Sequence, residues 1–417
     1  CPHLALTPAH RLLTACCLSD MLRIYAPDTP FSTDTLKVVF ELFVSQLRGV
    51  ADPRGQSFAR YYYLLERLAM VKSFVLMLDL NCDDLVRQLF ETLFESISAD
   101  HSIRVESHML DILVTVLEEI DAIPQLLIDV ILENLLASAK SEKPASYALA
   151  RSLLAKCAKV LHRPLNEFMQ ACLPTGAATI DSDHKEEWPR LLVELASVNV
   201  DLVAYLLPQL NEVVSIDDEA TRLKGVELLA ELLRLPANLV HAYPQLLHAL
   251  LAKFTDVSVA VRCTAIEHGI SLAQQPSLTD AVVAALKERV LDPEEKVRAA
   301  LVHALCDACA ATVRPFGPLI ESACHRMLDK REGVRSATRS RLSQLYCRHL
   351  SDGLRATGGK DTAAVELPDE LRGVPKKLLQ CYGVEAGRDL HSKLEIETLL
   401  ATKLLPSAPE LRLPALC

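Results

Sequence analysis

The chain has 417 residues, of which 50% are hydrophobic, 24% are charged and 5% are aromatic. So much apolar material excludes a disordered chain, and it provides a core for two or three ordinary domains or for one extended array. The low contents of aromatic residues and of glycine, with 13 residues, disfavour sandwiches, barrels and propellers and indicate a mostly helical protein.

The formal net charge of −10 disfavours nucleic-acid binding over the whole surface. Charged residues interrupt every apolar run before about 18 residues, so we expect no membrane span and no membrane partner. Thirteen cysteines without a secretory signal indicate a reducing, intracellular compartment. Because the chain begins Cys1-Pro2-His3, we expect a fragment that has been cut at both ends.

Apolar periodicity, punctuated mostly by proline, predicts about 19 helices in nine to ten pairs, from about residue 7 to about residue 404. We expect the first helix to run from Arg11 to Tyr25 and later helices to end at Glu119 and Leu233. A polar stretch with several glycines, from Ser351 to Asp369, predicts a flexible loop.

Three segments, at 250–273, 286–309 and 324–346, share one pattern in which an Asp ends a helix and a Val-Arg pair opens the next. The Asp residues, like the Arg residues, are spaced by 36 and 37 positions, a period typical of HEAT repeats with two helices each. We expect each Asp to cap the second helix and each Arg to reach an Asp of an adjacent repeat. This structural ladder comprises Asp256, Arg262, Asp292, Arg298, Asp329 and Arg335.

The predicted fold class is therefore all-α, a HEAT-repeat α-α superhelix, or solenoid. We expect the repeat array over residues 1–350, the flexible loop over 351–369, and further helices of the solenoid over 370–417, truncated at the C-terminus. In the middle repeat one apolar stripe is predicted, made of Val297, Ala300, Leu301, Ala304, Leu305 and Ala308.

Several segments resemble the Pds5 (precocious dissociation of sisters) sister-chromatid cohesion family. RLLTACCLSDMLRIYAPDTPF, at 11–31, is similar to a family hallmark with an Ala-Pro-Asp-Ala-Pro motif and departs from it only at Thr29. RYYYLLERLAMVKSFVLMLDL, at 60–80, resembles the next hallmark, a Tyr-rich helix followed by Val-Lys-Ser. Later segments follow in the family's order: LLPQL (206–210), RVLDPEEKVR (289–298), MLDKREGVR (327–335) and VPKKLLQCYGVEAGRDLHSKLE (374–395).

The resemblance implies a non-catalytic, nuclear, chromatin-associated scaffold that regulates the release and maintenance of cohesin on chromatin. It implies binding to the cohesin kleisin subunit, to the Wapl-type releasing factor and other short-motif regulators, and an influence on the cohesin SMC head region. The repeats alone predict only a long binding surface, so a HEAT scaffold of another complex, such as a phosphatase scaffold or a transport receptor, is the alternative.

By this resemblance, the first candidate site binds regulator peptides. Asp28 between stiff prolines suits pairing with an Arg of an incoming peptide. The alternative is a simple turn, with the nearby tyrosines packing against the neighbouring repeat. The candidate residues are Tyr25, Ala26, Pro27, Asp28, Pro30, Arg60 and Tyr61.

The second candidate site is basic. Residues 321–360 carry nine Lys or Arg and four Asp or Glu, a local excess of five positive charges. This run suits an acidic kleisin segment, an inositol polyphosphate or DNA phosphates, whereas a solvated face is the alternative. The candidates for kleisin or polyanion binding are Lys330, Arg331, Arg339, Arg341 and Arg348.

No catalytic or nucleotide-binding motif is present, so we expect no enzyme and no catalytic residue. Cys306 and Cys309 have C-x-x-C spacing but no second ligand pair, and we expect buried free thiols and no metal site. The only small-molecule ligand that we expect is the inositol polyphosphate; no cofactor is expected.

Overall fold

The computed structural model describes residues 7–26, 28–80, 82–174, 185–235, 238–356, 367–385 and 390–404. These ranges contain helices and turns but no strand, and none of their helices is long and apolar enough to cross a membrane. The predicted all-α fold class is thus confirmed. The chain forms two compact units, residues 1–209 and 210–417, a division that the sequence did not predict.

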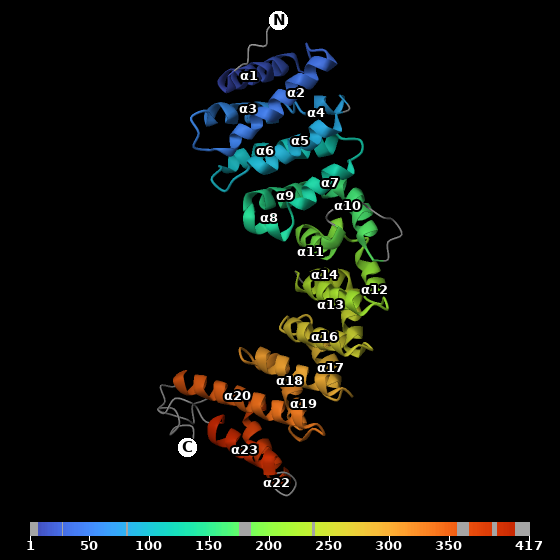
Figure 1. Ribbon diagram of the computed structural model, residues 1–417, viewed down its shortest axis with the longest axis vertical. Coiled ribbons are helices and arrows are strands. Elements are labelled where there is room, and N and C mark those ends of the chain that lie inside the picture. The colour runs from blue at the N-terminus through green and yellow to red at the C-terminus, as the bar shows by residue number, and fades with distance from the viewer. Residues whose placement is uncertain are drawn as a thin grey trace. The chain divides into compact units, whose positions relative to one another are not determined.

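In the first unit, the helices stack in two layers (Figure 1). One layer holds α1 (Pro8–Tyr25), α3 (Phe58–Met70), α6 (Ile103–Glu119), α9 (Pro144–Lys156) and α11 (Trp188–Val198). The other holds α2 (Thr33–Leu47), α5 (Asp83–Ser96), α7 (Gln125–Glu133) and α10 (Ala158–Cys172). The short helices α4 (Val75–Leu78) and α8 (Ala137–Glu142) lie in connections.

Helix α1 shows how the sequence defines these elements. Thr7 caps its first turn, with Oγ1 accepting from the backbone N–H of His10, and a proline occupies the first helical position. Its buried face is the narrow stripe Leu12, Ala15, Ser19 and Leu22. The helix ends at Tyr25 because Ala26, which precedes a proline, has an extended ψ of 138°.

Polar side chains on the surface of the first layer connect successive helices of this unit. The Tyr63 hydroxyl of α3 donates to the Asp20 carboxylate of α1 at 2.9 and 3.0 Å. In the same way, the Tyr147 hydroxyl of α9 donates to Glu194 of α11 at 2.7 Å, and Arg151 bonds the same carboxylate. In this unit, tyrosine hydroxyls help to fix the stacking.

The second unit also has two layers (Figure 1). One layer stacks α13 (Glu219–Arg234), α16 (Val259–Leu272), α18 (Glu295–Cys309) and α20 (Glu332–Ala356). The other contains α15 (Pro244–Ala252), α17 (Thr279–Arg289) and α19 (Gly317–Cys324). Helices α22 (Val374–Glu385) and α23 (Leu390–Thr402) pack against α20, and α12 (Leu210–Val213), α14 (Asn238–Ala242) and α21 (Asp369–Arg372) are short.

Buried Arg–Asp pairs join consecutive repeats of this unit. Arg298 binds both carboxylate oxygens of Asp329, with Nε at 2.9 Å and Nη2 at 2.8 Å, and its Nη1 donates to the Asp292 carbonyl at 2.7 Å. Arg262 pairs with Asp292 in the same manner at 3.1 and 3.2 Å. One step earlier, Arg222 pairs with Asp256 at 3.1 Å, so the ladder begins before the three repeats recognised in the sequence.

The aspartates do not cap the following helix, contrary to the expectation. Asp256, Asp292 and Asp329 instead accept the backbone N–H two residues later, at 2.9 Å, and thereby hold the connecting turn. The residue at the N-cap of α16 is Ser258. Each aspartate also receives a second cation from three residues earlier, which the sequence analysis missed: Lys253, Arg289 and Arg326, respectively.

Arg335 and the apolar stripe of α18 also differ from the expectation. Arg335, expected in the ladder, is half-buried and donates to the carbonyls of Asp329 and Lys330 in its own connection. The buried face of α18 is rotated from the predicted stripe, since the predicted alanines are only half-buried. It consists of Val297, Arg298, Leu301, Val302, Leu305, Cys306 and Cys309.

The predicted loop at 351–369 starts later than expected. Helix α20 continues through Ala356 because Leu350 and Leu354 are buried in a cluster with Tyr346 and Leu367. Residues 357–366 of that loop lie outside the described residues, and Asp369 already begins α21.

Replacing Arg298 with Ala should lower the free energy of unfolding by about 3 kcal/mol, because it removes the bidentate partner of a buried carboxylate. Arg298 is 3% exposed and Asp329 is 4% exposed, so water cannot replace the lost bonds. Urea unfolding of both proteins measures the effect. Arg355→Ala is the matched control, since its pair with Asp352 at 3.5 Å is exposed, and it should hardly change stability. Equal stability of Arg298→Ala and the unaltered chain would contradict a structural ladder.

The ladder also predicts acid sensitivity. Burial of the Asp329 carboxyl opposes its ionisation, but hydrogen bonds from Arg298 and the Arg331 N–H, with the charges of Arg298 and Arg326, outweigh burial and lower its pKa. The unfolded chain therefore binds more protons between the two pKa values, so stability falls as the pH drops below the ordinary value of 3.8. In Asp329→Asn, unfolding free energy measured between about pH 5 and about pH 3 should fall less steeply. Identical slopes would contradict this prediction.

Candidate functional site

A hollow of about 280 Å³ lies in the first unit, where the C-terminal ends of α1, α3 and α6 converge. Asp28 enters it from the connection after α1, and Glu119 is the last residue of α6. The turn after α3 contributes Val71, Lys72 and Ser73, and the start of α4 contributes Val75 and Leu76. The buried Leu22 of α1 adds an apolar side chain. Helix C-termini carry partial negative charge, which adds to that of the two carboxylates.

The end of α3 has an unusual conformation. The Ser73 N–H donates to the Leu68 carbonyl at 3.2 Å and the Lys72 N–H donates to the Ala69 carbonyl at 3.2 Å, a pattern that closes the helix through a left-handed residue. That residue is Lys72, with φ of 54°. Lys72 is exposed, whereas Ser73 is 3% exposed and its hydroxyl has no hydrogen-bond partner.

The structure brings together only part of the predicted regulator-peptide site. Ala26 and Asp28 line the hollow. Tyr25, which is 53% exposed, and the exposed Pro30 lie in the same segment but do not line it, and Pro27 lies outside the described residues.

Arg60 and Tyr61 are not part of this hollow. They lie in the first turn of α3, and the hollow is at its other end, roughly 16 Å away at 1.5 Å per residue. The Tyr61 ring lies so close to Gly49 that a Cβ there would be 2.2 Å from its Cζ, so Tyr61 packs on a backbone that only glycine permits. Arg60 is exposed.

Lys72, Ser73 and Glu119 were missed by the sequence analysis. The signal for two of them was present, since Val71-Lys72-Ser73 belongs to the segment that resembles a family hallmark. Nothing in the spacing showed that residue 28 and residues 71–76 share one hollow.

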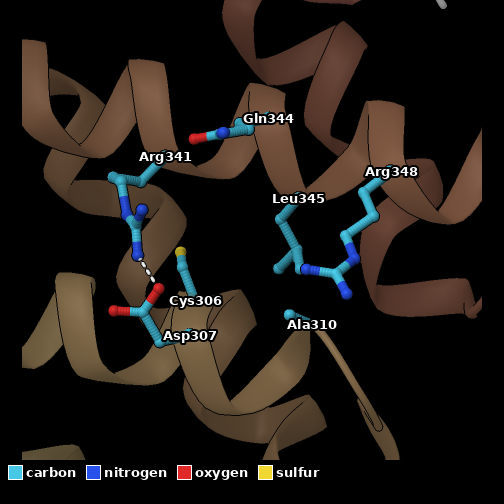
Figure 2. Close-up of a pocket in the computed structure, with 7 residues that line it drawn as sticks. All are labelled: Cys306, Asp307, Ala310, Arg341, Gln344, Leu345 and Arg348. Carbon is cyan, nitrogen blue, oxygen red and sulfur yellow. Dashed lines mark hydrogen bonds and ion pairs between the residues drawn. The ribbon is translucent and has the colours of Figure 1, made fainter.

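The basic run forms a second candidate site on α20. Two hollows of about 150 and 390 Å³ share Gln344 and Arg348. The smaller hollow faces α18, and Figure 2 shows Arg348 extending beside Leu345 toward Ala310. The larger hollow is lined by the end of α20 and by Thr402 and Lys403 at the end of α23.

The five predicted basic residues do not form one surface. Arg339 is fully buried, donating from Nε to the Met327 carbonyl at 3.0 Å and pairing with Glu395 of α23 at 3.4 Å, so it does not face a ligand. Arg341 pairs with Asp307 (Figure 2). It also donates to the His303 carbonyl at 3.3 Å. Exposed Arg331 pairs with Glu295 at 3.3 Å, and Lys330 is exposed in the connection before α20.

Of the five predicted basic residues, Arg348 is the one that lines both hollows and has no carboxylate partner among the described residues. It is exposed, and among the described residues none forms a hydrogen bond or ion pair with its guanidinium. Its neighbours along the same helix face, Arg341 and Arg355, are each paired with an aspartate. An anionic group that enters the groove therefore finds its strongest partner at Arg348.

Cys306 and Cys309 are buried and free. Burial raises the pKa of the Cys306 thiol to about 12 and raises the pKa of Cys309 as well, so both thiols stay protonated. Across the part of the chain that the structure describes, no group of three His, Cys, Asp or Glu side chains is placed to hold a metal ion.

Comparison with known proteins decides the family. The model of the family "Sister chromatid cohesion protein PDS5 protein" matches residues 11–416. The chain belongs to this family. It is 33% identical over 405 residues to PDS5 homolog A of Danio rerio, and 33% identical over 401 residues to PDS5 homolog A-B of Xenopus laevis. These alignments cover 96% and 95% of the chain, but only 30% and 29% of the relatives.

Among solved structures, the chain is similar to that of the Pds5-Scc1 complex, with a TM-score of 0.76 and 20% identity. The similarity covers 98% of this chain and 61% of the solved one. It supports the HEAT-repeat fold, and the family match confirms the resemblance that the sequence motifs indicated.

Proposed function

We propose that this PDS5 family member is a non-catalytic scaffold that regulates cohesin on chromatin in the nucleus. It binds the cohesin kleisin subunit, as in the Pds5-Scc1 complex, and captures short peptides from regulators such as the Wapl-type releasing factor. Through these contacts it acts near the cohesin SMC head region and affects the release and maintenance of cohesin.

One observation carries the peptide-binding part of the proposal. Asp28 and the segment 71–76, which belong to two separate family hallmarks, line the same hollow. Asp28 and Lys72 are both exposed, so packing of the core does not require either side chain. Binding of a common ligand explains why these two distant segments meet at one hollow. The carboxylates of Asp28 and Glu119, with the helix C-termini, favour a basic side chain of the peptide.

To test this, an array of 15-residue peptides covering the releasing factor of the zebrafish is screened against the chain, and affinities of bound peptides are measured by calorimetry. In Asp28→Lys the affinity should fall about 100-fold or more, because a like charge replaces the counterion of the peptide. The melting temperature should stay unchanged, since Asp28 is exposed.

Glu142→Lys is the matched control for this charge reversal. Glu142 is exposed, lies in the same unit at the end of α8 and does not line the hollow. It should keep full affinity. Absence of any bound peptide, or an Asp28→Lys affinity equal to that of the control, would contradict the proposed site.

The unpaired Arg348 supports a second proposal, that the groove of α20 binds an acidic kleisin segment or an inositol polyphosphate. Charge attraction across such a groove weakens as salt rises. Because Arg339 is buried and Arg331 is paired, the proposal now rests on Arg348 rather than on the whole basic run.

Arg348→Glu should weaken binding of a kleisin fragment or of inositol hexakisphosphate about tenfold at low salt, with a smaller loss at high salt. Lys296→Glu is the control, because Lys296 is an exposed cation of the same unit outside the groove. Equal affinities of the two variants for both ligands at low salt would leave Arg348 as a solvated surface charge.

A further inference from the structure

The end of α3 combines two features that lower stability. Among the described residues other than glycine, Lys72 alone has a positive φ, at 54°. Helices that end in this way usually have glycine at that position, because a side chain there is strained. A lysine therefore occupies a position where a glycine would make the fold more stable.

The second feature is the hydroxyl of Ser73. Its oxygen is buried and has no hydrogen-bond partner, and Ser73 is one of the residues that line the hollow. A buried polar group without a partner costs stability, and an alanine of nearly the same size would avoid the cost. Two adjacent residues thus each carry a polar group that the fold does not need.

Neither an ion pair nor a hydrogen bond among the described residues explains why a lysine occupies position 72. In the part of the chain that the structure describes, no carboxylate pairs with its ammonium group and no acceptor bonds it. An exposed position leaves only a weak attraction to the carbonyl end of α3. Strain and unsatisfied polar groups that nothing in the fold compensates cluster at ligand-binding sites.

We propose that Lys72 and Ser73 form a subsite of the hollow that binds a carboxylate of the docked peptide. The ammonium group provides the charge and the Ser73 hydroxyl provides a hydrogen bond, while Asp28 and Glu119 bind a basic group of the same peptide. The ligand is therefore a short segment with both an acidic and a basic side chain. This inference rests on the peptide-binding function proposed for the hollow.

Two variants separate a binding role from a structural role. Lys72→Gly relieves the backbone strain and Ser73→Ala removes the orphan hydroxyl, so the melting temperature of each should rise or stay equal. Affinity for the tightest peptide of the releasing-factor array should nevertheless fall about tenfold or more in each. Lys72→Arg, which keeps the positive charge, should retain most of the affinity.

The peptide provides the complementary test. Replacing its acidic side chain with the amide should weaken binding to the unaltered chain but leave binding to Lys72→Gly unchanged, since the partner is already missing. A lower melting temperature with full affinity in Lys72→Gly and Ser73→Ala would show that both residues are structural and would overturn the subsite. A peptide whose binding does not depend on any acidic residue would overturn it too.

These outcomes are distinguishable from failure of the parent proposal. If the unaltered chain binds a peptide and loses it in Asp28→Lys, yet Lys72→Gly and Ser73→Ala bind normally, the hollow binds peptides and only the carboxylate subsite is rejected. If the unaltered chain binds no peptide of the array, both proposals fail together.

Discussion

A buried guanidinium must have its N–H groups occupied, and this requirement organises the second unit. Arg298 meets it by binding both oxygens of Asp329 in the next repeat and two carbonyls of its own connection. One guanidinium thus fixes the turn within its own repeat through Nη1 and the position of the next repeat through Nε and Nη2. Because α18 and α20 are registered by this contact, the groove that exposes Arg348 between them also depends on it.

In the first unit, tyrosine hydroxyls as well as Arg151 connect successive helices. Tyrosine hydroxyls of α3 and α9 donate to carboxylates of neighbouring helices, and the hollow lies where the C-terminal ends of α1, α3 and α6 meet. Packing of the layers therefore determines where the hollow lies. The polar side chains that line it do not take part in that packing and are available to bind a ligand. Lys72 and Ser73 illustrate this separation, since neither side chain takes part in the stacking contacts described above.

Periodicity was sufficient to predict the helical pairs and the partners of Arg262 and Arg298, because a repeat of constant length places equivalent residues at equal intervals. It could not predict that Asp329 holds a turn instead of capping a helix, since both roles use the same residue type near the same position. The burial of Arg339 was missed because its partner, Glu395, is 56 residues away and only tertiary packing brings them together. The hollow was predicted only in part, because the sequence motifs contain both Asp28 and Val71-Lys72-Ser73 but do not show that these two segments lie side by side.

The contact between Arg298 and Asp329 stabilises the stacking of repeats specifically and is not a by-product of packing. A double-mutant cycle with Arg298→Ala, Asp329→Ala and the combined variant, followed by urea unfolding, measures their interaction directly. We expect a coupling free energy of about 2 kcal/mol or more, with the double variant less destabilised than the two single effects combined. Additive effects of the two substitutions would contradict it.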